Sequence, residues 1–120
     1  MAAEAQSGWV IGLSGELGAG KTQFVKGLAR GLGITDRVHS PTFALLNIYD
    51  GGRLRLFHLD LYRLEDQEQI VAAGLEEYFS PGGVAVVEWI ERWRGPKPAS
   101  YRKFSFEIVS KTERRILQQD

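Results

Sequence analysis

A glycine-rich stretch near the start of the chain limits most strongly what this sequence can fold into. Residues 15–22 read Gly-Glu-Leu-Gly-Ala-Gly-Lys-Thr and match the pattern G-x-x-x-x-G-K-[ST] in full. The apolar run at residues 9–13 predicts a short buried strand before it. From Lys21 the apolar residues recur with helical spacing until Gly33. Strand, glycine turn and helix in this order predict the opening unit of an α/β fold.

This stretch predicts a loop that binds the phosphates of a nucleotide. Small residues let successive backbone N–H groups point at phosphate oxygens, and the following helix adds the positive end of its dipole. The Lys21 ammonium then reaches the β- and γ-phosphates, and the Thr22 hydroxyl is a ligand for Mg²⁺. The predicted binding residues of this loop are Gly15, Gly18, Ala19, Gly20, Lys21 and Thr22. One alternative is a glycine turn that binds nothing. A dinucleotide-binding turn does not fit, because the glycines fall as G-x-x-G-x-G.

The rest of the chain predicts a mixed sheet. Residues 43–49 and 54–59 read as strands on either side of Asp50-Gly51-Gly52, a tight-turn signal that predicts an antiparallel hairpin. Further elements are predicted at residues 64–79 (two short helices broken at Gly74), 84–87, 104–109 and 114–117. We therefore predict an α/β protein with a P-loop NTPase-like three-layer fold and a mixed parallel/antiparallel sheet. Residues 1–120 are expected to form a single domain with a short leader at residues 1–8.

Composition excludes several kinds of chemistry. The chain has no cysteine, which rules out thiolate catalysis, iron–sulfur clusters and cysteine-bound zinc. Its 15 basic and 15 acidic side chains give a formal net charge of +0, so the chain has no overall attraction to nucleic acid or anionic membrane. No apolar run approaches the length of a membrane span, and residues 1–7 lack the basic start of a signal peptide. We expect a cytoplasmic protein.

Two carboxylates follow predicted strands. Glu88 ends the run Val-Ala-Val-Val, and Asp60 ends the strand at residues 54–59. Strand ends beside a phosphate-binding loop lie on the ligand side of an open α/β sheet, so both acids are candidates for the metal–phosphate centre. The alternative for either is a helix cap or an ordinary surface acid. Glu91 is a weaker candidate of the same kind.

Several other residues allow two interpretations. Thr42, in the segment Ser-Pro-Thr-Phe, either senses the γ-phosphate or belongs to an ordinary turn. His58 and His39 are more often packed or exposed residues than metal ligands. Trp89 and Trp93 indicate either core anchoring or a partner surface, and we expect one of them in the core. Five basic residues surround a proline loop and are either solvated or face a nucleotide, a partner or RNA: Arg92, Arg94, Lys97, Arg102 and Lys103.

Four motifs in this order resemble the TsaE family, the small bacterial P-loop ATPases of tRNA threonylcarbamoyladenosine biosynthesis. They are GELGAGKT, SPTF, HLDLYRL and VVEWIE. The resemblance implies Mg²⁺-dependent ATP hydrolysis, weak in isolation, coupled to a TsaB–TsaD complex, with tRNA reached through that complex. By motif it implies that Lys21 binds phosphate and that Thr22 and Glu88 hold Mg²⁺. It also implies that Asp60 either orients water or acts near the γ-phosphate, and that Thr42 belongs to a switch-like loop.

Two other functions remain open at this stage. A small P-loop kinase would need a lid and an acceptor pocket, and little of the chain follows Glu88. A nucleotide-binding interaction module without hydrolysis is the other possibility. Members of the resembling family usually carry a longer segment before the first strand than the Met1–Gly8 leader of this chain, and there it contributes to the nucleotide pocket.

Overall fold

The structure is a computed structural model and describes residues 5–15, 20–35, 37–38, 45–79, 82–95 and 101–119. A six-stranded sheet in the order β2-β3-β4-β1-β5-β6 forms its centre. The strands are β1 (Val10–Gly15), β2 (Leu46–Tyr49), β3 (Leu56–Asp60), β4 (Val84–Glu88), β5 (Tyr101–Ile108) and β6 (Arg114–Gln119). The four inner strands are parallel, and the two edge strands pair antiparallel to their neighbours. The predicted mixed sheet is confirmed.

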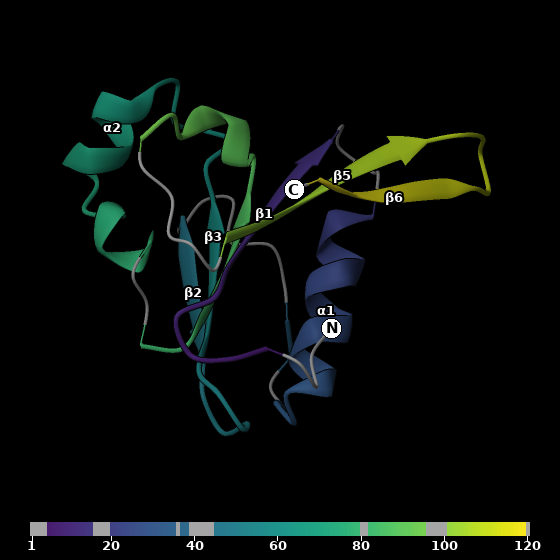
Figure 1. Cartoon of the computed structure of the whole chain (residues 1–120), viewed down its shortest axis with the longest axis horizontal. Coiled ribbons are helices and arrows are strands. Elements are labelled where there is room, and N and C mark those ends of the chain that lie inside the picture. Colours follow the sequence, from purple (N-terminus) through teal and green to yellow (C-terminus); the bar gives the residue numbers. More distant parts are fainter. Residues whose placement is uncertain are drawn as a thin grey trace.

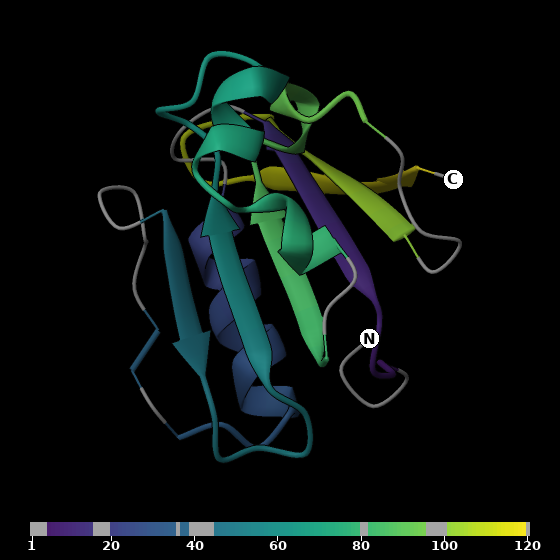
Figure 2. The ribbon, with the colours of Figure 1, turned by 90° about the vertical axis from the view of Figure 1, so that its left-hand side faces the viewer.

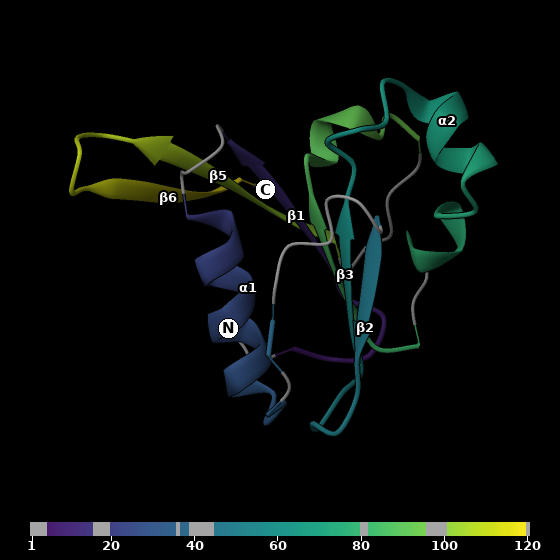
Figure 3. The same cartoon turned by 180° about the vertical axis from the view of Figure 1, so that it is seen from behind.

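Helices cover both faces of the sheet. The long helix α1 (Lys21–Gly31) lies on one face, and α2 (Gln67–Ala72) lies on the other (Figure 1). The view from behind shows the same three layers, with the β5–β6 hairpin projecting beyond α1 (Figure 3). Two short 3₁₀ segments complete the fold: η1 (Glu76–Phe79) and η2 (Ile90–Arg92). None of the helices in the described ranges is long and apolar enough to cross a membrane.

Successive side chains of an inner strand point to opposite faces of the sheet and belong to two separate hydrophobic cores. On β4, Val84 and Val86 pack toward α1, whereas Ala85 and Val87 pack on the opposite face with Ile70 of α2. Because both faces are covered, β4 is buried along its whole length, as its continuous apolar sequence predicts. The sheet seen face-on, with α1 behind it, shows this layering (Figure 2).

The hairpin predicted from Asp-Gly-Gly is present, but its connection is longer than a tight turn. β2 ends at Tyr49 and β3 begins at Leu56. The segment between them packs on the end of α1, where the Arg53 backbone N–H donates to Leu32 O at 2.7 Å. A Cβ at Gly52 would lie 2.4 Å from that same carbonyl oxygen. This contact with α1 explains why the strands do not continue to the turn.

The described part of the leader is packed against the domain. Ala5 is 1% exposed and belongs to the core under α1. Its carbonyl accepts a hydrogen bond from the Arg53 guanidinium at 3.0 Å, and Gly8 N–H donates to Gly83 O at 2.7 Å. Residues 5–8 therefore help to close the end of the sheet opposite the glycine-rich loop.

Candidate functional site

The carboxyl ends of β1, β3 and β4 lie side by side. Parallel register pairs Asp60 of β3 with Glu88 of β4, and Glu88 with Leu13 of β1. Leu61 N–H donates to Glu88 O at 3.1 Å, which continues the pairing one residue past β3. Because β1 leads directly into the glycine-rich loop, this register brings both predicted acids to the edge of the sheet where that loop begins.

Glycines at both ends of the loop have backbone conformations that other residues rarely adopt. Gly15 has φ of 136°, and a Cβ there would lie 2.5 Å from Phe106 O on the neighbouring strand β5. Gly20 has φ of 102° and directly precedes α1. Only glycine takes these conformations without strain, so the first and last glycines of the pattern shape the loop. Gly18 and Ala19 lie outside the described residues.

Lys21 is buried at the start of α1. Its side chain bends back so that Nζ donates to Gly15 O at 2.7 Å and lies 4.0 Å from the centroid of the Trp89 ring. Burial lowers the pKa of the Lys21 ammonium, while the carboxylates of Glu88, Glu91 and Asp60 oppose that shift. A positive charge held in a desolvated position beside carboxylates is suited to bind an anion such as a phosphate.

Both predicted acids are buried. Asp60 and Glu88 are each 4% exposed. Asp60 Oδ1 accepts the backbone N–H of Tyr62 at 2.9 Å, and Asp60 N–H donates to Leu45 O at 3.0 Å. Glu88 Oε2 lies 2.5 Å from Nε2 of His58, which is fully buried on β3. Buried carboxylates are rare without such partners, and their burial means that neither acid is an ordinary surface residue.

Trp89 forms one side of the site. It has a left-handed backbone with φ of 60°, and its ring lies 5.0 Å from the Tyr62 ring centroid. In the described part of the chain, the other non-glycine residue with positive φ is Leu45, whose carbonyl holds Asp60. Strained residues of this kind gather at functional sites. Trp93 is 3% exposed in the core, which confirms the expectation that one of the two tryptophans is structural.

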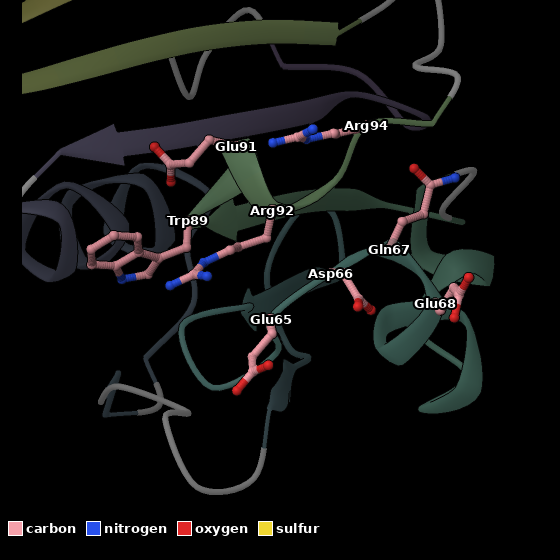
Figure 4. A pocket seen from close by; sticks show the side chains of 8 residues that line it. All are labelled: Glu65, Asp66, Gln67, Glu68, Trp89, Glu91, Arg92 and Arg94. Carbon is pink, nitrogen blue, oxygen red and sulfur yellow. The ribbon is translucent and has the colours of Figure 1, made fainter.

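A groove of about 650 Å³ adjoins Trp89 on the side of the sheet that carries α2 (Figure 4). Its walls carry acidic side chains from the segment around the start of α2 and basic ones that follow β4. The lining residues are Glu65, Asp66, Gln67, Glu68, Trp89, Glu91, Arg92 and Arg94. Glu91 is exposed here rather than buried with Glu88.

The basic residues near the proline loop do not all share this groove. Arg92 lies 5.7 Å from the Trp89 ring centroid, and Arg102 lies 3.8 Å from that of Trp9. Trp9 precedes β1 whereas Trp89 follows β4, so the two arginines stack at opposite ends of parallel strands.

The structure therefore brings together most of the predicted site residues that it describes. Lys21, Asp60 and Glu88 converge, and Thr22 is half-buried in the first turn of α1. Thr42 and His39 lie outside the described residues. Sequence reasoning missed the contact of His58. The available signal was its position two residues before Asp60, which places both side chains on one face of the strand.

A glycine loop between a parallel strand and a helix, with a buried lysine facing acids from the neighbouring strands, defines a P-loop-type α/β protein. The crystal structure of YdiB from Bacillus subtilis has a similar fold, with a TM-score of 0.78 and 40% identity over 96% of this chain and 70% of that one. The sequence model of the family described as threonylcarbamoyl adenosine biosynthesis protein TsaE matches residues 1–116, and the chain belongs to this TsaE family.

Two relatives show the extent of the match. The chain is 53% identical over 88 residues to the tRNA threonylcarbamoyladenosine biosynthesis protein TsaE of Bacillus subtilis, which covers 73% of this chain and 54% of the relative. It is 44% identical over 111 residues to the protein of that name from Treponema pallidum, which covers 92% of this chain and 82% of the relative. The chain thus spans little more than half of the Bacillus relative.

Proposed function

We propose that this protein is a Mg²⁺-dependent ATPase of tRNA threonylcarbamoyladenosine biosynthesis. The observation that carries the proposal is the buried Lys21 ammonium beside the loop glycines, with Asp60 and Glu88 at the same edge of the sheet. A cation and two acids in this arrangement fit a triphosphate together with its metal ion.

The glycine loop and Lys21 form the phosphate-binding part of the site. In this proposal, backbone N–H groups of the glycine loop and of the first turn of α1 donate hydrogen bonds to the phosphate oxygens. The residues assigned to this role are Gly15, Gly20 and, outside the described residues, Gly18 and Ala19. The Lys21 ammonium has three N–H donors, of which Gly15 O takes one, so the side chain can rotate to share its charge with the β- and γ-phosphates. Positioning and charge stabilisation supply most of the catalysis in this reaction class.

Thr22 and Glu88 fit the requirements of a magnesium ligand set. Mg²⁺ prefers oxygen ligands and is usually held by one or two protein groups, substrate phosphates and waters. When bound, the ion neutralises charge on the β- and γ-phosphate oxygens.

Asp60 is assigned to the attacking water. Its Oδ1 accepts the Tyr62 N–H at 2.9 Å, which helps to hold the carboxylate in place. A carboxylate has about four lone-pair sites, so it can hydrogen-bond a water molecule in addition to its protein partners. That water attacks the γ-phosphorus, and the bond to the β–γ bridging oxygen breaks to give ADP and inorganic phosphate. By its resemblance to the family, Thr42, which lies outside the described residues, is assigned to a switch-like loop.

The relatives are named as tRNA threonylcarbamoyladenosine biosynthesis proteins, which supports a role for the proposed activity in tRNA modification. By its resemblance to the family, the chain acts in the cytoplasm with a TsaB–TsaD complex that contacts the tRNA. A kinase function has less support because the described residues after Glu88 form η2 and the β5–β6 hairpin rather than a lid over the site.

The test is rescue of tRNA modification in bacteria depleted of their own TsaE-family protein. Nucleoside mass spectrometry should show threonylcarbamoyladenosine restored by the wild type and not by Lys21→Ala. Lys26→Ala, which changes an exposed lysine of the same helix, is the matched control and should rescue. Full rescue by Lys21→Ala would show that hydrolysis is not required and would favour the interaction module.

A further inference from the structure

His58 is a buried polar residue that the proposed reaction does not yet use. It lies on β3 between Leu56 and Asp60, and alternation places all three side chains on the face toward α1. Its strand neighbours on that face, Leu56 and Val86, are apolar and fully buried. Packing alone would therefore be satisfied by an apolar residue at this position.

With the residues that the structure describes, the imidazole makes one hydrogen bond, and its partner is Glu88. Nε2 lies 2.5 Å from Glu88 Oε2. An ionised carboxylate can only accept, so Nε2–H is the donor. Nδ1 has no hydrogen-bond partner within the part of the chain that the structure describes. A buried polar atom without a partner is unfavourable, so the contact with Glu88 is the feature that distinguishes histidine from an apolar residue here.

The sheet places the backbone of Glu88, but it does not place its carboxylate. The side chain has several rotatable bonds beyond the backbone that β1 and β3 hold by pairing. A hydrogen bond to Oε2 restrains the far end of this side chain and leaves Oε1 as the oxygen that His58 does not use. Groups that hydrogen-bond a metal ligand orient it in this way, and their loss typically lowers metal affinity or activity 10–100-fold.

We propose that His58 is a positioning residue that orients the Glu88 carboxylate toward the metal–phosphate centre. It touches neither the nucleotide nor the metal ion and acts through Glu88. The proposal rests on the proposed function, because it needs Glu88 to be a metal ligand.

The test compares two amides at this position. The side-chain nitrogen of Gln reaches the place of Nε2, whereas that of Asn reaches only the place of Nδ1. Mn²⁺ binding, measured by electron paramagnetic resonance with a non-hydrolysable ATP analogue, should weaken about 10–100-fold in His58→Asn. His58→Gln should recover most of that affinity. Nucleotide binding in EDTA should be unchanged in both variants.

Leu56→Val controls for a general loss of stability, because it trims a buried residue of the same strand without touching Glu88. It should leave Mn²⁺ affinity unchanged. If His58→Asn does not fold, His58→Met serves as the variant that removes the donor and keeps an apolar side chain. Equal Mn²⁺ affinities of the wild type and the donor-free variant would overturn the positioning role. Equal weakening in His58→Gln and His58→Asn would also overturn it.

Failure of the positioning role of His58 can be distinguished from failure of the proposed ATPase function. If the wild type binds Mn²⁺ with nucleotide but never hydrolyses ATP, even with TsaB–TsaD, the ATPase proposal fails. A difference between the Gln and Asn variants would then still support the positioning of Glu88. If the wild type binds no Mn²⁺ in the presence of nucleotide, both proposals fail.

Discussion

Replacement of Glu88 by Ala and by Gln separates the structural and the chemical contributions of this residue. Glu88 is 4% exposed, and its Oε2 accepts a hydrogen bond from the fully buried His58. Glu88→Ala removes the acceptor and leaves the buried Nε2–H of His58 without a partner. In Glu88→Gln the side-chain amide oxygen can still accept a hydrogen bond from this group. Both variants remove the same negative charge. The free energy of desolvating that charge therefore cancels when the two are compared.

The magnitude follows from the lost acceptor. A buried donor left unsatisfied costs about 1–3 kcal/mol, and exchanging a charged acceptor for a neutral one costs about 1 kcal/mol. The free energy of unfolding should therefore be lower in Glu88→Ala than in Glu88→Gln by up to about 2 kcal/mol, and further by any cavity that the smaller side chain leaves. Urea denaturation of the two variants and the wild type measures this difference.

The two variants should lose ATP hydrolysis to the same extent although they differ in stability. Both variants lose the proposed metal ligand, so Mg²⁺-dependent hydrolysis in the presence of TsaB–TsaD should fall about 100-fold or more in each. Binding of a fluorescent nucleotide in EDTA should be unchanged or tighter, because a negative charge near the phosphates has been removed. Full hydrolysis by Glu88→Gln would refute the metal role. Equal loss of binding with and without Mg²⁺ would refute it as well.

Three further results are expected. Asp60→Asn keeps an acceptor for the Tyr62 N–H, so nucleotide binding should persist. The rate of ATP hydrolysis should fall at least about tenfold. An unchanged rate would remove Asp60 from the mechanism. Gly15→Ala should lower the free energy of unfolding, because its Cβ would lie 2.5 Å from Phe106 O. Gly27→Ala should raise it by about 0.5–1 kcal/mol, because a Cβ at this position of α1 has open space around it. Chemical denaturation measures both changes, and a change of the same sign in the two variants would contradict this reasoning. Burial, and secondarily the nearby Glu91, raises the pKa of Tyr101 from 10.0 to about 12. As pH rises, the Tyr101 phenol ionises at lower pH in the unfolded state than in the folded state, so the free energy of unfolding should fall by at most about 3 kcal/mol between pH 10 and 12. Tyr101→Phe should abolish this loss. Identical ultraviolet titrations of the wild type and Tyr101→Phe near pH 12 would show that Tyr101 does not ionise there and would refute the prediction.

Local patterns in the sequence were sufficient to predict most of the elements. The apolar run before the glycine loop is β1, and the helical spacing after Lys21 is α1, which ends close to Gly33. The break at Gly74 separates α2 from η1, as predicted. These elements depend on interactions between residues close in sequence, and periodicity and glycine report such interactions directly. The length of the β2–β3 connection was missed because α1, distant in sequence, determines it.

The partners of the site residues were less accessible to sequence reasoning. The motif alone identifies Lys21, but its place over the Trp89 ring depends on a contact between the start of α1 and the residue that follows β4. The sequence likewise predicts residues 5–8 only as part of a leader, whereas the structure packs them against the domain. Both arrangements come from contacts between segments that no short window of sequence contains.

By itself the sequence determined the glycine loop, its lysine and the apolar pattern of each strand, because each of these depends on local backbone geometry and hydrophobicity. Only the tertiary structure decided that Glu88 meets both Asp60 and His58. These residues lie on separate strands, and their contact depends on the register of β3 against β4. A shift of that register by one residue would turn either side chain to the opposite face of the sheet, so strand pairing, rather than the presence of these residues, builds the site.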